Sequence, residues 1–198
     1  MPINIYAVKH PLVLNWTNHL IHNNQSQYDQ QELIHKISLS LIYEACRNTI
    51  HSQTLYLKYL NQMEKVWLIE NQPIDLLCSD IQILQIISKD VKTLIPAVKI
   101  HPILAEKQKN QWQITSAYIN RLALQKSKHI IIIEHELLAD KIRTILSHIY
   151  DQNTINPQIT ICCNKCNSIE LDNLGQKYID VNIYTSYLVN TETNHIHN

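Results

Sequence analysis

The chain has 198 residues, a length typical of one domain with a self-sufficient hydrophobic core. Lysine and arginine together number 17, as do aspartate and glutamate, so no net charge favours binding to nucleic acid or to an anionic membrane surface. No uncharged apolar run reaches the roughly 18 residues of a membrane-spanning helix, so membrane insertion is not expected.

The composition also bears on the compartment. Residues 1–4 lack the basic and apolar regions of a secretory signal, so secretion is not expected. The five cysteines predict reduced thiols in a cytosol-like compartment. An excess of Ile, Asn, Gln and Lys indicates an AT-rich genome, which favours the plastid stroma or the bacterial cytoplasm, although the absence of Phe opposes this.

The first half of the chain predicts alternating helices and strands. The clearest element is an amphipathic helix over residues 31–46, in which six apolar residues recur at helical spacing: Leu33, Ile34, Ile37, Leu41, Ile42 and Ala45. The other expected elements are an extended segment 3–9, a helix 11–20, a loop 23–26, strands 65–69 and 74–78, and a helix 81–87.

The second half contains the strongest strand signal. Residues 129–133 form a continuous apolar run, followed by charged residues, which is the pattern of a parallel strand buried on both faces. The remaining elements are a strand 92–100 bent at Pro96, a hairpin tip 106–111, a helix 137–150, an apolar stretch 159–163, a segment 169–177 and a last strand 181–187.

This alternation predicts one α/β domain over residues 1–189, with a mainly parallel sheet flanked by helices. The polar tail, residues 190–198, is expected to be flexible. We expect Ile131 and Ile133 to be buried in a central strand, and Leu138 and Ile142 of the following helix to pack against the sheet.

Several segments of the sequence resemble uracil phosphoribosyltransferases. Residues 6–13, Tyr-Ala-Val-Lys-His-Pro-Leu-Val, resemble the N-terminal signature of that family. Residues 37–45 follow at a family-like distance and resemble its long helix ending in Tyr-Glu-Ala. Residues 129–134 lie where the family has the strand before its phosphoribosyl-diphosphate loop, and residues 183–185 resemble its late Leu-Tyr-Thr strand. The resemblance implies the type I phosphoribosyltransferase fold, a β-hairpin arm and a homodimeric state.

The resemblance also implies that the central phosphate-binding loop is degenerate. In the family, an acidic pair or Asp-Pro precedes Ala-Thr-Gly-Gly-Ser, whose backbone N–H groups cup the 5′-phosphate. The corresponding segment has no glycine and places negative charge where phosphate would bind; its residues include Glu134, His135, Glu136, Ala139, Asp140 and Lys141. We do not expect this loop to bind phosphate well.

The two other ligand-binding segments of the family are altered as well. Its diphosphate loop, Pro-Ile-Leu-Arg-Ala-Gly, corresponds to a segment without arginine or glycine that contains Asp75, Cys78, Ser79 and Asp80. We expect its uracil-binding segment to have no counterpart after Thr191. The sequence therefore predicts no catalysis and no cofactor.

Three further patterns have more than one interpretation. Cys163 and Cys166 form a C-x-x-C without a second ligand pair, which favours structural cysteines over a metal site or a redox pair. The run Glu134, His135, Glu136 is either an acid/base group or the remnant of a lost loop. Tyr56 and Tyr59 are either a docking surface or ordinary core.

These observations predict a non-catalytic homologue that acts as a protein-interaction, connector or accessory subunit of a larger assembly, with another protein or a second copy as its partner. Two alternatives stay open: an active enzyme that makes UMP from uracil and phosphoribosyl diphosphate, and a module that senses another small ligand. With only His135 and Lys141 to offset them, five carboxylates are expected to converge in an acidic cleft: Asp75, Asp80, Glu134, Glu136 and Asp140.

Overall fold

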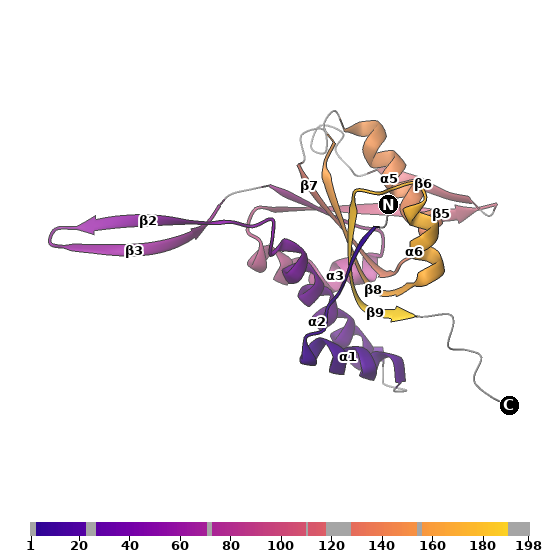
Figure 1. Cartoon of the computed structure of the whole chain (residues 1–198), viewed down its shortest axis with the longest axis horizontal. Coiled ribbons are helices and arrows are strands. Elements are labelled where there is room, and N and C mark those ends of the chain that lie inside the picture. Colours follow the sequence, from indigo (N-terminus) through magenta and orange to yellow (C-terminus); the bar gives the residue numbers. More distant parts are fainter. Residues whose placement is uncertain are drawn as a thin grey trace.

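A mainly parallel sheet with helices on both faces forms the body of the protein (Figure 1). The computed structural model describes residues 3–22, 27–70, 73–109, 111–117, 128–153 and 156–189. The sheet has the order β1 (Asn4–Ala7), β9 (Val181–Val189), β8 (Gln158–Asn167), β7 (His129–Glu136), β4 (Ile74–Cys78), β5 (Val98–Gln108) and β6 (Gln111–Ala117). Neighbouring strands are parallel except β5 and β6, which are antiparallel. The predicted fold class is confirmed.

Strand β7 is buried on both faces, as its apolar run predicts. Ile130 and Ile132 face a core formed with α5 (Ala139–Gln152) and α6 (Ser168–Gly175), whereas Ile131 and Ile133 face a core formed with α2 (Gln27–Cys46) and α3 (Ile81–Leu94). The remaining helix, α1 (Pro11–His22), packs on α2. Strand β7 is therefore packed between two hydrophobic cores, one on each face of the sheet.

The helix after β7 begins later than expected. Leu138 lies at the N-terminal cap of α5 and is 38% exposed, so the prediction that it packs against the sheet is wrong. Leu137 is buried instead, together with Ile142. Strand β7 continues to Glu136 before the chain turns. Because of this extension, the buried leucine is Leu137 and not Leu138.

The predicted strand 92–100 is wrong in its first half. Helix α3 continues to Leu94, because Val91 extends the buried spacing set by Ile83 and Ile87. Ile95 has an extended backbone (φ −129°, ψ 89°), the conformation favoured before proline, so Pro96 ends the helix and β5 begins at Val98.

A two-stranded antiparallel hairpin, β2 (Ser52–Tyr59) and β3 (Gln62–Ile69), projects away from the body (Figure 1). We refer to it as the arm. The sequence predicted only residues 65–69 of it as a strand. Every residue of its strands is exposed except Val66, which is half-buried.

No helix in the described part of the chain is both long and apolar enough to cross a membrane. The predicted loop 23–26 and the polar tail 190–198 lie outside the described residues.

Candidate functional site

The carboxyl ends of the parallel strands bring together most of the residues that the sequence singled out. Glu134, near the end of β7, is buried, with a side chain 2% exposed. Its Oε1 accepts a hydrogen bond from Ser79 Oγ at 2.5 Å, and its Oε2 accepts one from Lys141 Nζ at 2.8 Å. Ser79 follows β4 and Lys141 lies in the first turn of α5. One carboxylate therefore connects the end of β4 to the start of α5.

Burial controls the ionisation of this group. Loss of water raises the pKa of Glu134 above its usual range, while Lys141 and Ser79 oppose the increase. Burial also raises the pKa of the neighbouring Cys78 thiol to about 12, and its Sγ donates to the Asp80 carbonyl oxygen at 3.1 Å. Cys78 is therefore a neutral thiol near pH 7 and is not an activated nucleophile.

The N-terminus of α3 is closed by its own cap. Asp80 Oδ1 accepts hydrogen bonds from the backbone N–H groups of Gln82 at 2.9 Å and Ile83 at 3.2 Å. This arrangement satisfies N–H groups that an isolated helix end would offer to an anion.

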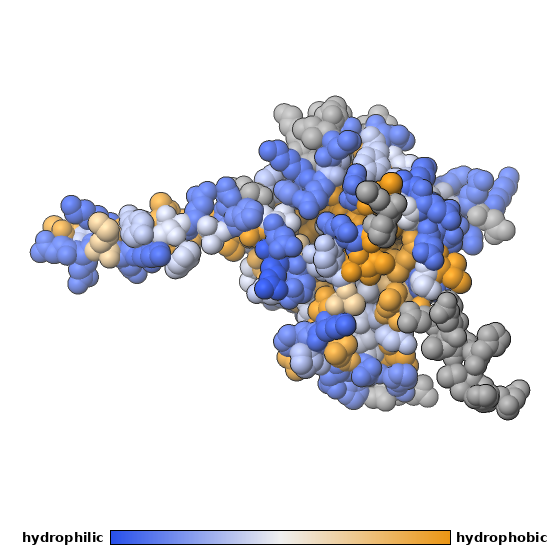
Figure 2. All heavy atoms as spheres, in the orientation of Figure 1, coloured by the Kyte–Doolittle hydropathy of each residue, from blue (hydrophilic) through white to orange (hydrophobic). Residues whose placement is uncertain are grey.

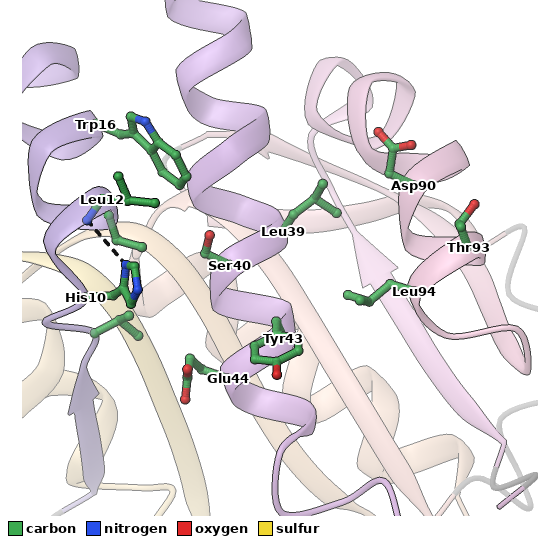
Figure 3. Close-up of a pocket in the computed structure, with 12 residues that line it drawn as sticks. His10, Leu12, Trp16, Leu39, Ser40, Tyr43, Glu44, Asp90, Thr93 and Leu94 are labelled. Atoms are coloured by element: carbon green, nitrogen blue, oxygen red, sulfur yellow. Dashed lines mark hydrogen bonds between the residues drawn. The ribbon is translucent and has the colours of Figure 1, made fainter. Parts of the chain in front are cut away.

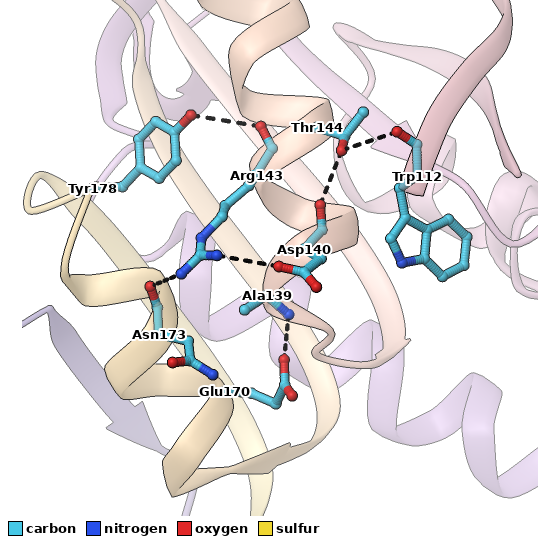
Figure 4. Close-up of polar contacts among 8 residues, drawn as sticks. All are labelled: Trp112, Ala139, Asp140, Arg143, Thr144, Glu170, Asn173 and Tyr178. Atoms are coloured by element: carbon cyan, nitrogen blue, oxygen red, sulfur yellow. Dashed lines mark hydrogen bonds and ion pairs between the residues drawn. The ribbon is translucent and has the colours of Figure 1, made fainter. Parts of the chain in front are cut away.

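The N-terminus of α5 is closed by a residue from another helix (Figure 4). The backbone N–H of Ala139 donates to Glu170 Oε2 at 2.5 Å, and Glu170 belongs to α6. Arg143 pairs with Asp140 at 3.1 Å and also donates to the carbonyl oxygen of Asn173. A carboxylate thus occupies the positive end of the helix that follows β7.

The remaining predicted residues have separate partners. Glu136 pairs with Lys165 at 3.2 Å, across neighbouring strands β7 and β8. His135 is exposed, and its Nδ1 lies 3.4 Å from Asn164 Nδ2. No group of three or more His, Cys, Asp and Glu side chains that could hold a metal ion occurs among the described residues.

The prediction that five carboxylates converge in an acidic cleft is therefore wrong. Asp75 lies near the start of β4, paired in register with Ile130 near the start of β7, and bonds to His101 at 2.6 Å. It is separated from Glu134 by most of the strand length. The other four carboxylates are each neutralised or used in capping, and two of the cations involved, Arg143 and Lys165, were missed in the sequence.

Arg143 could have been found from its spacing to Asp140, because residues three apart on a helix are neighbours. Lys165 requires the register of β8 against β7, and Glu170 requires the packing of α6 on α5. No local sequence signal gives either of these.

The five cysteines are all free and buried. The Cys163 thiol is hydrogen-bonded to Cys166, an interaction that raises the pKa of Cys163 and lowers that of Cys166. Both side chains lie in the hydrophobic core on the α5 side of the sheet, where solvent does not reach them.

Tyr56 and Tyr59 are both exposed on the arm, at 62% and 60%. Their separation along β2 places them on opposite faces of the hairpin, so they do not form one patch.

The whole chain can be compared with known proteins. It is 22% identical over 188 residues to a "Uracil phosphoribosyltransferase homolog" of Porphyra purpurea, covering 94% of this chain and 88% of that protein. The resemblance to uracil phosphoribosyltransferases is confirmed. No protein-family profile matches the sequence.

A solved structure shares the fold. The AQ2163 protein of Aquifex aeolicus superposes with a TM-score of 0.76 at 12% identity, covering 94% of this chain and 88% of that one. A purine phosphoribosyltransferase of Pyrococcus horikoshii Ot3 has a TM-score of 0.44 at 9% identity, covering 88% and 95%. The first similarity defines a shared architecture; the second is too distant to transfer any geometry.

Proposed function

We propose that this protein is a non-catalytic homologue of uracil phosphoribosyltransferase that acts by binding protein partners, as a connector or accessory subunit. The observation that carries the proposal is the Glu170 carboxylate on the first N–H of α5. In the family that the sequence resembles, the loop after the equivalent strand holds the 5′-phosphate of phosphoribosyl diphosphate.

A phosphate at this position would meet an existing negative charge. Two like charges 4 Å apart repel by about 4 kcal/mol near a protein surface. Asp140 adds a second carboxylate in the same turn, although Arg143 offsets part of its charge. The ligand would have to displace Glu170 before it could bind the helix N-terminus.

The loop after β4 supports the same conclusion. Holding a diphosphate leaving group needs free backbone donors or cations. Here Asp80 uses the N–H groups at the start of α3, and Ser79 is bonded to Glu134. The only glycine of the sequence, Gly175, is the last residue of α6 and does not lie in either loop.

The arm supports the interaction role. It exposes large apolar side chains on an element that projects from the body (Figure 2). Exposed apolar surface of this kind is a feature of contacts with other proteins. The plastid stroma or the bacterial cytoplasm stays a prediction from composition.

The test is a sensitive assay of UMP formation from uracil, phosphoribosyl diphosphate and Mg²⁺ with the full chain. We expect no UMP above a no-enzyme control. Turnover would show that the chain is an enzyme of the kind suggested by the name of its relative. Calorimetric titration with phosphoribosyl diphosphate or UMP completes the test: binding tighter than about 100 μM, with the matching rise in melting temperature, would instead indicate a ligand sensor.

A further inference from the structure

A hollow of about 550 Å³ lies over α2, between α1 and α3 (Figure 3). We call it the helix groove. Residues four apart lie in one row along a helix, and such rows form the ridges between which another helix packs. Each of the three helices lines the groove with one such pair: Leu12 and Trp16 on α1, Leu39 and Tyr43 on α2, and Asp90 and Leu94 on α3.

The helix groove continues along α2 into a second hollow. The second hollow, of about 330 Å³, shares Tyr43 and Leu94 with the first and is also lined by Cys46 and Ile50. From Leu39 to Cys46 the axis of α2 advances roughly 10 Å, at about 1.5 Å per residue. Two hollows in a row along one helix suit an elongated occupant, such as a helix, better than a single compact molecule.

Much of the apolar lining of the groove is open to water. Leu12 is 54% exposed and Tyr43 is 61% exposed, although both lie on helices that pack on the body. Apolar residues that adjoin one another at a surface are a feature of contacts with another molecule. A segment lying in the groove would remove both side chains from water.

The charged groups of the helix groove favour a basic occupant. The described residues that line it include two carboxylates, Glu44 and Asp90, and no lysine or arginine. Figure 3 shows the two carboxylates at opposite corners of the groove, Asp90 on α3 and Glu44 on the side of α2 that faces His10. A bound segment therefore meets one carboxylate at each end.

Both carboxylates can accept a further partner. Asp90 Oδ2 lies 2.8 Å from His35 Nε2, but the Asp90 side chain is 47% exposed. Glu44 Oε2 lies 3.7 Å from Arg47, which is longer than a hydrogen bond, and its side chain is 33% exposed. Lysine or arginine side chains of a bound segment could pair with both carboxylates, whereas glutamates in the same places would be repelled.

We propose that the helix groove binds an amphipathic α-helix of another protein, with an apolar stripe of residues three and four apart and with lysine or arginine flanking the stripe at both ends. The two hollows receive the apolar side chains, and Asp90 and Glu44 pair with the flanking cations. The inference rests on the proposed role of the chain as a connector or accessory subunit, and it names the chemistry of the partner and the surface that receives it.

The test titrates the full chain into a fluorescein-labelled model helix and measures fluorescence anisotropy. The probe is a peptide of about 14 residues, with leucine at helical spacing and lysine elsewhere. One reference peptide has glutamate in place of lysine, and another has the composition of the probe with its leucines scattered. We expect the lysine helix to bind at least ~30-fold more tightly than either reference, because it alone matches both the apolar lining and the carboxylates.

Variants of the groove separate the two contributions. Glu44→Lys/Asp90→Lys should weaken binding of the lysine helix at least ~30-fold and make the glutamate helix the tighter ligand. Leu12→Ala/Tyr43→Ala should weaken the lysine helix at least ~10-fold. Both of these residues are exposed, so the fold should be kept.

The matched control is Glu106→Lys/Asp172→Lys, the same change of charge at two exposed carboxylates that do not line the groove. It should bind the lysine helix as the wild type does. A reversed preference in Glu44→Lys/Asp90→Lys also excludes misfolding, because an unfolded variant would not gain selectivity for the glutamate helix.

Four results would overturn the inference. Equal binding of the three peptides would show no recognition of a basic amphipathic helix, and an unchanged preference in Glu44→Lys/Asp90→Lys would place the helix elsewhere. Competition by 4-phenylbutylamine at the affinity of the lysine helix would make the groove a site for a small amine. Binding that weakens as the protein concentration rises would mean that a second copy of the chain covers the groove.

None of these measurements depends on UMP formation. A chain that makes UMP and binds the lysine helix selectively refutes the proposed function alone. An inactive chain that fails the peptide test refutes the inference alone.

Discussion

Glu134 and Lys141 form a buried ion pair whose two members are 2% and 14% exposed. A pair of this kind costs desolvation energy when it forms, but removal of one partner leaves an uncompensated charge in the interior. Ser79 gives Glu134 one further hydrogen bond. Both oxygens of the Glu134 carboxylate are hydrogen-bonded, so the pair is suited to fixing the residue after β4 against the first turn of α5.

Replacement of this lysine should make stability depend on pH. Lys141 opposes the upward shift in the pKa of Glu134, so Lys141→Met should raise that pKa further. An acid with a raised folded-state pKa stabilises the fold below its unfolded pKa, and this contribution is lost as pH rises through the folded value. We expect Lys141→Met to lose about 3 kcal/mol of unfolding free energy near pH 8 and much less near pH 5, measured by denaturant unfolding.

The matched control is Glu134→Gln/Lys141→Met, which removes both charges. It should be more stable than the single variant near neutral pH and should show little pH dependence from this site. An equal loss at both pH values in the single variant would mean that packing of the lysine side chain, and not the charge of Glu134, determines the effect.

Glu170 caps a helix to which it does not belong. Glu170→Ala should lower the unfolding free energy by about 1 kcal/mol, as loss of an N-terminal cap does. Glu170→Gln keeps an acceptor oxygen and should lose less. Added inorganic phosphate should recover part of the melting temperature of the alanine variant, because the freed N–H groups can then bind the anion. A wild type that responds equally to phosphate would contradict the role assigned to Glu170.

At the scale of elements, β7 is the strand on which both cores depend. Its residue Ile131 lies in register between Leu76 on β4 and Thr160 on β8 and is only 4% exposed.

Ile131→Asp should therefore prevent cooperative folding, because an unpaired carboxylate would be buried and a loss of more than about 4 kcal/mol is expected. Ile169→Asp is the matched control, since Ile169 is exposed in the first turn of α6, where an acidic residue is tolerated. Circular dichroism and thermal unfolding measure both. A folded Ile131→Asp variant with a normal melting transition would show that the strand is not central to stability.

The accuracy of a predicted element boundary depended on whether nearby residues alone determine it. Strand 74–78 was predicted with its observed bounds, because it is a short apolar run between turn residues. The end of α3 was misplaced because Val91 and Ile95 suit either a helix or a strand, and only their packing against α2 and β5 distinguishes the two.

At the scale of the whole molecule, the body and the arm differ in how much apolar surface they bury. The body buries two hydrophobic layers against one sheet, whereas the arm has no layer of its own beneath it. The strand β2 was missed for this reason: residues 52–59 alternate between two exposed faces, so no buried apolar pattern marks them. An element without a hydrophobic layer beneath it gives a weak signal in a single sequence.

The sequence by itself determined the α/β class, the central strand 129–133, the long helix around Leu41 and the resemblance confirmed by the Porphyra purpurea relative. These features rest on periodicity and on short motifs, which are local. Only the tertiary structure decided that Glu170 reaches α5, that Lys165 neutralises Glu136 and that Asp75 lies away from the other carboxylates. Those facts depend on strand register and helix packing, which join residues far apart in the chain and which no local pattern specifies.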